Sequence, residues 1–136
     1  MGINEFEKIS RQIRGELVMM SHKTGAAHLG SALSCVDILV AAYWGTLNID
    51  PGNPLQEERD RFILSKGHAA SALYAVLAFK GFFSRELLGE YACEGGCLAE
   101  HPIPEGVPGL EVATGSLGHG LSLGIGMAIA GRIRKK

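Results

Sequence analysis

The sequence predicts an α/β domain that is rich in helices and contributes one strand to a parallel sheet. The apolar run Phe62–Leu64 is followed closely by Gly67 and His68, which is typical of a strand that ends at the ligand-binding rim of an open α/β sheet. Downstream, the segment Ala69–Lys80 is apolar on most faces, which predicts a buried helix. With 136 residues, 46% of them hydrophobic, the chain has the size of one domain and can bury a core.

The N-terminal segment has apolar residues at helical spacing, with charged residues between them. These apolar positions are Phe6, Ile9, Ile13, Leu17 and Met20. The pattern predicts an amphipathic helix with Asn4 as its N-cap and its end near Lys23. His22 falls on the polar side of this helix and is interpreted as a structural polar residue.

A loop of small residues, Thr24–Ser31, separates this helix from the next one. Ser34 and Asp37 have the spacing of a capping box, which predicts a second helix extending to about Leu47. Because this helix is apolar nearly all round, we expect it to be buried on most sides.

Glycine and proline divide the rest of the chain. They predict a loop over residues 48–58 and irregular structure over 93–109. Gly81 is expected to be the C-cap of the helix Ala69–Lys80, and Ser84 is expected to cap a short helix that runs through Tyr91.

A glycine-rich loop after Thr114 leads into a helix predicted over Leu121–Ile133. Gly124, Gly126 and Gly131 lie in this helix, although each costs about 1 kcal/mol relative to alanine. So many glycines are expected only where another helix or a cofactor approaches closely, and both interpretations stay open.

Charge and hydropathy exclude several classes of protein. The 13 lysines and arginines nearly balance the 14 aspartates and glutamates, so the net charge of -1 offers no basis for binding nucleic acid or an anionic membrane. No apolar stretch reaches the length of a transmembrane helix. The N-terminus is acidic and lacks the apolar run of a secretory signal, so a cytoplasmic location is expected.

The three cysteines suit a reducing compartment, because they cannot all pair with one another. Cys93, Cys97 and His101 follow one another at intervals of four and could be drawn as zinc ligands. A fourth ligand is not apparent and structural zinc sites usually have tighter cysteine spacing, so no metal site is predicted.

Four histidines lie next to glycine or proline or at the edges of apolar segments. They are His28, His68, His101 and His119. Because imidazole can donate, accept or carry a proton near neutral pH, several of them at loop positions predict polar ligand chemistry. Lys66, close to His68, is interpreted as a solvated charge.

Five segments resemble, in the same order, the N-terminal part of the transketolase family. They are Ala27-His28-Leu29-Gly30 with Leu33-Ser34 and Asp37-Ile38-Leu39, then Ile49-Asp50-Pro51, the run Asp60–Ala69, His101-Pro102, and Thr114–Gly120. The resemblance implies an incomplete thiamine-diphosphate-binding fold over residues 1–136. It also implies the transfer of two-carbon ketol units between sugar phosphates in carbohydrate metabolism, with thiamine diphosphate and Mg²⁺ as cofactors.

The resemblance also implies roles for individual residues. The histidine matching His68 contacts the diphosphate of the cofactor, and Gly115, Ser116 and Leu117 match the loop that lines the cofactor. His28 and His101 match residues that touch the donor sugar near the reacting carbon, where they can stabilise an alkoxide or move its proton.

The chain departs from the family pattern in three places. Glu100 stands where the family usually has glycine, and His119 where it usually has glutamine, so His119 is interpreted as structural. Ala27 and Leu29 replace a glycine and a proline around His28. These changes put the sugar specificity in doubt more than the cofactor.

Two parts of a transketolase have no counterpart in this sequence: the Gly-Asp-Gly metal motif and the pyrimidine-binding domain. We therefore expect the Mg²⁺ ligands on another segment, and a partner that is a separate or missing C-terminal transketolase segment within a homo- or hetero-oligomer. The chain alone is then expected to be inactive. The alternatives are a non-catalytic truncated fragment or interaction module and, more distantly, a deoxyxylulose phosphate synthase, whose His-Leu-Gly segment is similar.

Overall fold

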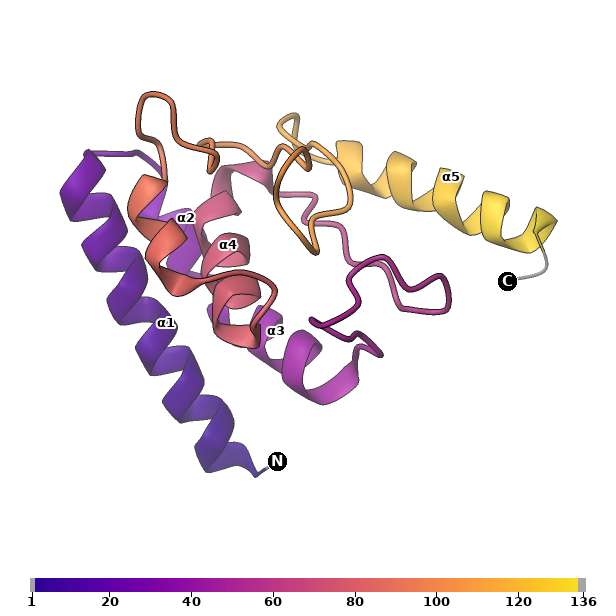
Figure 1. The fold of residues 1–136 in the computed structure, drawn as a ribbon, viewed down its shortest axis with the longest axis horizontal. Helices are drawn as coiled ribbons and strands as arrows, with labels where there is room; N and C mark the ends of the chain where they lie inside the picture. The colour runs from indigo at the N-terminus through magenta and orange to yellow at the C-terminus, as the bar shows by residue number, and fades with distance from the viewer. Residues whose placement is uncertain (1, 135–136) are drawn as a thin grey trace.

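The computed structural model describes residues 2–134, in which five α-helices are joined by short turns and long loops (Figure 1). The α-helices are α1 (Ile3–Thr24), α2 (Leu29–Leu33), α3 (Val36–Ala41), α4 (Ala70–Lys80) and α5 (His119–Ile133). Three short helices of other types lie between the α-helices: the π-helix η1 (Ala42–Thr46) and the 3-10 helices η2 (Gly67–Ala69) and η3 (Arg85–Glu90). The predicted short helix after Ser84 is therefore the 3-10 helix η3.

Helix α1 is amphipathic, as its pattern predicts, and buries Ile13, Leu17 and Met20 against α3 and α4. Its predicted N-cap is wrong. The helix begins earlier than expected, because the backbone N–H of Gly2 donates to the carboxylate of Glu5 at 2.8 Å and so caps the end. Asn4 therefore lies within the first turn.

The predicted helix from Ser34 to Leu47 is divided into α3 and η1, and Leu29–Leu33 forms a separate helix that begins inside the predicted loop. Ser34 does not cap α3, because its backbone is helical (φ -69°, ψ -18°) and it ends α2 instead, with Cys35 at the N-cap position of α3. Its hydroxyl donates to the carbonyl oxygen of Ser31 at 2.9 Å. Burial is also less complete than expected, since Ile38 is 69% exposed.

The centre of the molecule is α4, of which residues 70–78 are all buried. The helix contacts α1, α2 and α3, and its alanines allow these neighbours to approach closely. The prediction for this segment is confirmed to within one residue, and Gly81 ends the helix in the left-handed conformation with φ of 101°.

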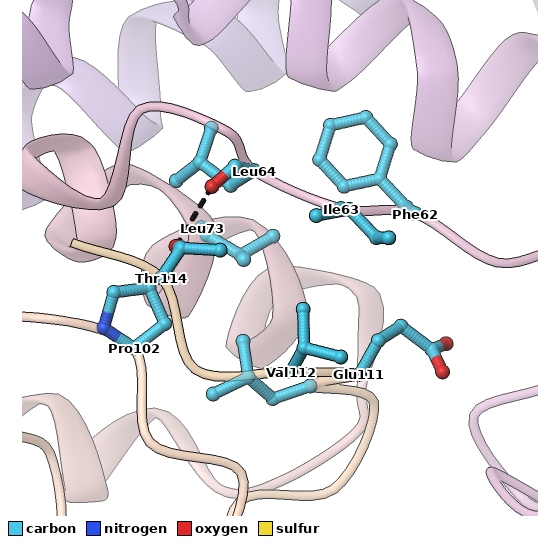
Figure 2. Close-up of a pocket in the computed structure, with 9 residues that line it drawn as sticks. Phe62, Ile63, Leu64, Leu73, Pro102, Glu111, Val112 and Thr114 are labelled. Carbon is cyan, nitrogen blue, oxygen red and sulfur yellow. Dashed lines mark hydrogen bonds between the residues drawn. The ribbon is translucent and has the colours of Figure 1, made fainter. Parts of the chain in front are cut away.

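The predicted strand Phe62–Leu64 is extended but forms no ladder, and no strand occurs among residues 2–134. Its neighbour is the segment 111–114, which runs beside it in Figure 2. The two segments are joined through a side chain, the Thr114 hydroxyl, which donates to the Leu64 carbonyl at 2.8 Å. A strand requires backbone bonds to a neighbour on a regular repeat, and this pair of segments lacks that repeat.

Helix α5 lies at the opposite end of the molecule from α1 (Figure 1). It begins at His119, two residues before the predicted start, and most of its side chains are exposed. Leu121, Ile125, Ile129 and Ile133 recur every four residues and are between 53% and 77% exposed. These four residues form an apolar stripe, which we call the α5 stripe. None of the helices described over residues 2–134 is both long and apolar enough to cross a membrane.

Candidate active site

Three histidines from distant parts of the chain meet in one cluster. The ring centroids of His28 and His68 are 4.8 Å apart, those of His68 and His101 are 5.0 Å apart, and those of His28 and His101 are 6.4 Å apart. All three pairs are arranged edge to face. The structure thus brings together three residues that the sequence singles out separately.

The backbone of His28 is in the left-handed region, with φ of 71°, immediately before α2. A residue with a Cβ adopts this conformation at a cost of about 1 to 3 kcal/mol, and such residues cluster at functional sites. The conformation sets the direction in which the His28 ring leaves the chain toward His68.

His68 lies in η2, directly before the buried helix α4. Its Nδ1 is buried and has no hydrogen-bond partner. A buried ring nitrogen without a partner costs about 1 to 3 kcal/mol, so its presence calls for a ligand group that would complete the bond.

Close backbone contact places the glycine-rich loop beside these histidines. A Cβ on Gly67 would lie 2.3 Å from the carbonyl oxygen of Thr114 and 3.0 Å from the nitrogen of Gly115. A Cβ on Gly115 itself would be 3.8 Å from Cδ2 of His101. Only glycine at position 67 allows the two segments to touch in this way.

The next residues of this loop are less enclosed. Ser116 is exposed, and Leu117 is 71% exposed. His119 is exposed at the start of α5 and belongs to none of the ring pairs of the cluster. Of the predicted cofactor-binding residues, the structure places His68 and Gly115 in the cluster and leaves the side chains of Ser116 and Leu117 open at its edge.

Comparison with known proteins identifies the family. Residues 7–135 match the family model described as transketolase, thiamine diphosphate binding domain. This chain belongs to the transketolase family. The match extends over nearly the whole sequence, so it includes all three histidines and the glycine-rich loop.

Two curated transketolase relatives show the extent of the similarity. The chain is 46% identical, over 99% of its length, to a subunit of the apulose-4-phosphate transketolase of Phocaeicola vulgatus. It is also 46% identical, over 79% of its length, to the 6-deoxy-6-sulfo-D-fructose transketolase subunit SqwG of a Clostridium species. It spans 48% of the first relative and 39% of the second, which is less than half of either.

The fold is that of solved transketolases. The crystal structure of transketolase from Campylobacter jejuni superposes with a TM-score of 0.83 at 32% identity, covering 90% of this chain and 19% of the other. The helix-rich arrangement therefore corresponds to one segment of a much longer enzyme.

The transketolase residues present here fit a diphosphate group. The unpartnered Nδ1 of His68 can complete a hydrogen bond with an anionic oxygen, which is a charge-assisted bond. The Gly67 contact leaves the backbone of Thr114 and Gly115 close by without an intervening side chain. Both features match a ligand that offers oxygen acceptors to a narrow backbone cradle.

The arrangement of the site depends on Lys66, which is not the solvated charge that its sequence context predicts. Its Nζ donates to the carbonyl oxygen of Ser31 at 2.7 Å and lies 3.0 Å from the hydroxyl of Ser34. These bonds join the turn before His68 to the helix after His28. No local sequence signal indicates this link, because its two partners lie 35 and 32 residues away along the chain.

The segment that supports the glycine-rich loop is fixed by an ion pair that no sequence pattern indicates. Both terminal guanidinium nitrogens of Arg59 donate to the carboxylate of Glu111, and the two side chains are 11% and 8% exposed. Figure 2 shows Glu111 and Thr114 on the segment beside residues 62–64. The pocket between these two segments has no room for a water molecule, so it is a packed seam and not a ligand site.

Within residues 2–134, no three histidine, cysteine, aspartate or glutamate side chains are arranged to hold a metal ion. Cys93, Cys97 and His101, whose spacing along the sequence could suit zinc ligands, do not form such a group in the described structure. Both cysteines are exposed free thiols.

Proposed function

We propose that this chain is the N-terminal, thiamine-diphosphate-binding part of a transketolase that transfers two-carbon ketol units between sugar phosphates. The observation that supports this proposal best is the cluster of His28, His68 and His101 beside Gly115. Thiamine diphosphate supplies the electron sink for cleavage of a carbon–carbon bond, and the protein supplies orientation and electrostatics.

In this proposal each histidine has its own task. His68 donates a ring N–H to a diphosphate oxygen, while Gly115, Ser116 and Leu117 line the cofactor. His28 and His101 face the donor sugar, where an imidazole can stabilise a developing alkoxide or accept and return its proton. Their ring centroids are 6.4 Å apart, so both can reach groups on one small sugar.

The proposal includes a partner segment. We propose that residues 1–136 form one partial domain and act only with a further transketolase segment, on the same or a separate polypeptide, in a homo- or hetero-oligomer. Two relatives of similar sequence are named as subunits, which supports a separate polypeptide. Mg²⁺ is expected with the diphosphate, but residues 2–134 offer no set of ligands for it, so no step is assigned to a metal.

The substrate class is a sugar phosphate, and the location is the cytoplasm. The balanced net charge of -1 gives no support for nucleic acid or an anionic membrane as a partner. The two subunit relatives act, by their names, on different sugars, so the names do not define the sugar for this chain.

A non-catalytic interaction module is the second candidate function. It is favoured by the α5 stripe, because four exposed apolar residues on one helix are suited to contact another chain. The two functions differ in what the histidines do, since an interaction module does not need them.

Calorimetric titration with thiamine diphosphate and Mg²⁺, followed by a ketol-transfer assay, tests the proposal. The chain alone should show no transfer and no tight binding, and both should appear when the C-terminal segments of a transketolase relative are supplied. His68→Ala in the complemented enzyme should weaken cofactor affinity by about 1.5 to 3 kcal/mol, the value of one charge-assisted hydrogen bond.

His28→Ala and His101→Ala in the same complemented enzyme should act mainly on the sugar, through kcat and the sugar KM. His22→Ala, on α1, is the matched control and should change neither property. Equal behaviour of all four variants would favour the interaction module instead.

A further inference from the structure

The loop between η3 and His101 folds back on itself, and Cys93 and Cys97 lie on the two sides of its turn. The backbone N–H of Ala92 donates to the carbonyl oxygen of Leu98 at 2.8 Å, and that of Gly96 donates to the carbonyl oxygen of Cys93 at 3.1 Å. Cys93 and Cys97 are the first pair inside the bond between residues 92 and 98. Cysteines joined by a disulfide have Cα atoms about 4.4 to 6.8 Å apart. The bond from Gly96, the residue directly before Cys97, to the carbonyl oxygen of Cys93 keeps the two cysteines close in the folded loop.

Both cysteines have contacts at the C-terminal end of η3. The Sγ of Cys93 is 3.6 Å from the carbonyl oxygen of Gly89. The carboxylate of the next residue, Glu90, accepts a hydrogen bond from the backbone N–H of Cys97 at 3.4 Å. Both thiols are free and exposed, whereas the third cysteine, Cys35, is buried.

We propose that Cys93 and Cys97 are a redox modification site, at which a peroxide converts the two thiols into a reversible intramolecular disulfide. The Cys93 thiolate attacks one oxygen of hydrogen peroxide, so that an S–O bond forms, the O–O bond breaks and one water leaves after protonation. The Cys97 sulfur then attacks the sulfenic sulfur, so that the S–S bond forms and the second water leaves. Two thiols are oxidised and one peroxide is reduced to two waters.

The order of these two steps follows from the surroundings of Cys97. Desolvation, and after it the neighbouring Glu90 carboxylate, raise the pKa of the Cys97 thiol. A raised pKa leaves less of the reactive thiolate at neutral pH, so the attack on peroxide is assigned to Cys93, and Cys97 reacts afterwards with the sulfenic sulfur held in the same loop.

The new bond would close a small ring inside a loop that the hydrogen bond between residues 92 and 98 already closes. Leu98 is 1% exposed and anchors the C-terminal side of the pair in the core. Its fixed position also separates the disulfide from His101, three residues further on. The inference therefore does not depend on the proposed transketolase activity.

Peroxide treatment of the full chain, followed by alkylation of the remaining thiols under denaturing conditions and mass spectrometry, tests the proposal. Cys93 and Cys97 should become protected from alkylation together, with the loss of two hydrogen atoms, while Cys35 stays alkylated. A thiol reductant should restore both. The rate should not depend on protein concentration, because the bond forms within one chain.

Three variants serve as controls. Cys35→Ser should behave as the parent chain, whereas Cys93→Ser and Cys97→Ser should fail to form the internal disulfide. The proposal is overturned if the parent chain instead yields separate sulfinic acids at the two positions, a disulfide that includes Cys35, or crosslinks between chains.

Discussion

The ammonium group of Lys66 lies 2.7 Å from the carbonyl oxygen of Ser31, and this contact joins the two segments that present His28 and His68. Ser31 lies in α2, which directly follows His28, and Lys66 lies directly before the turn that contains His68. The 4.8 Å separation of the two rings therefore depends on a bond made by neither histidine.

Replacement of Lys66 by methionine should loosen this link. The hydrogen bond of a charged donor is worth about 1.5 to 3 kcal/mol, so we expect Lys66→Met to lower the free energy of unfolding by that amount, as measured by urea denaturation. Lys66→Arg keeps the charge and should recover part of the loss. Equal urea midpoints for the methionine variant and the parent chain would show that the link is unimportant for stability.

The close backbone contact at Gly67 predicts that adding one methyl group there lowers the free energy of unfolding. In Gly67→Ala the new Cβ would lie 2.3 Å from the Thr114 carbonyl oxygen, so one of the two segments must move. We expect a loss of about 1 to 3 kcal/mol in urea denaturation. Gly15→Ala is the matched control, because Gly15 lies within α1 with open space around it and should gain up to about 1 kcal/mol. Similar changes in both variants would contradict the close contact.

Removal of one partner of the Arg59–Glu111 pair should be more harmful than removal of both. Each side chain is nearly buried, so Glu111→Leu leaves the Arg59 charge without its partner, at a cost of about 3 to 5 kcal/mol. The double variant Arg59→Met with Glu111→Leu removes both charges and should recover much of that loss. A double-mutant cycle in urea measures the coupling, and simple additivity of the two single changes would argue against it.

The raised pKa values of the tyrosines predict how the free energy of unfolding changes at alkaline pH. Burial raises the pKa of all three, Tyr43, Tyr74 and Tyr91, and raises that of Tyr74 to about 12 from its ordinary value of 10.0. Because the folded pKa lies above the unfolded one, this contribution to stability is complete below pH 10.0 and is lost as the pH rises toward about 12. Tyrosinate absorbance should appear at higher pH in the native chain than in urea.

The measurement has its own control in Tyr74→Phe. This variant removes one titrating phenol and its weak bond to the His101 carbonyl, and should reduce the slope of stability against pH in that window. Native and urea titration curves that coincide would mean that the phenols are not buried.

The α5 stripe predicts association of the isolated chain. Ile125 and Ile129 are more than half exposed on the same side of the helix, so we expect the chain to form oligomers as its concentration rises. The double variant Ile125→Glu with Ile129→Glu should be monomeric in analytical ultracentrifugation. Replacement of the exposed Ile3, at the start of α1, by glutamate is the control and should leave association unchanged. A strictly monomeric parent chain would contradict this prediction.

Local sequence patterns predicted the parts of the fold that depend on neighbouring residues. The boundaries of α4 follow from an apolar run that ends at Gly81, and the structure confirms them to within one residue. The predicted cap at Ser34 failed because this residue keeps the helical backbone that ends α2, so that Cys35 takes the N-cap position of α3. A capping pattern does not reveal that the residues just before it already form a helix of their own.

Contacts between segments that are distant in the sequence could not be predicted from the sequence. Lys66 and Ser31 are 35 residues apart, and Arg59 and Glu111 are 52 apart, so no spacing rule relates them. The same reason explains the strand predicted at Phe62–Leu64, because extended backbone becomes a strand only through its partner. The histidines were found individually from their context, but their distances from one another depend on these long-range contacts.

The hydrogen bond from Thr114 to Leu64 has a consequence for the order in which the chain folds. It closes a loop of 50 residues, and the entropy lost in closing so long a loop must be offset by contacts that form first. Helices α1, α3 and α4 make their mutual contacts earlier in the sequence and can assemble during synthesis, before residue 114 has been made. The cluster of histidines is thus expected to be among the last features to become ordered, and a chain released too early would have its core but not its candidate site.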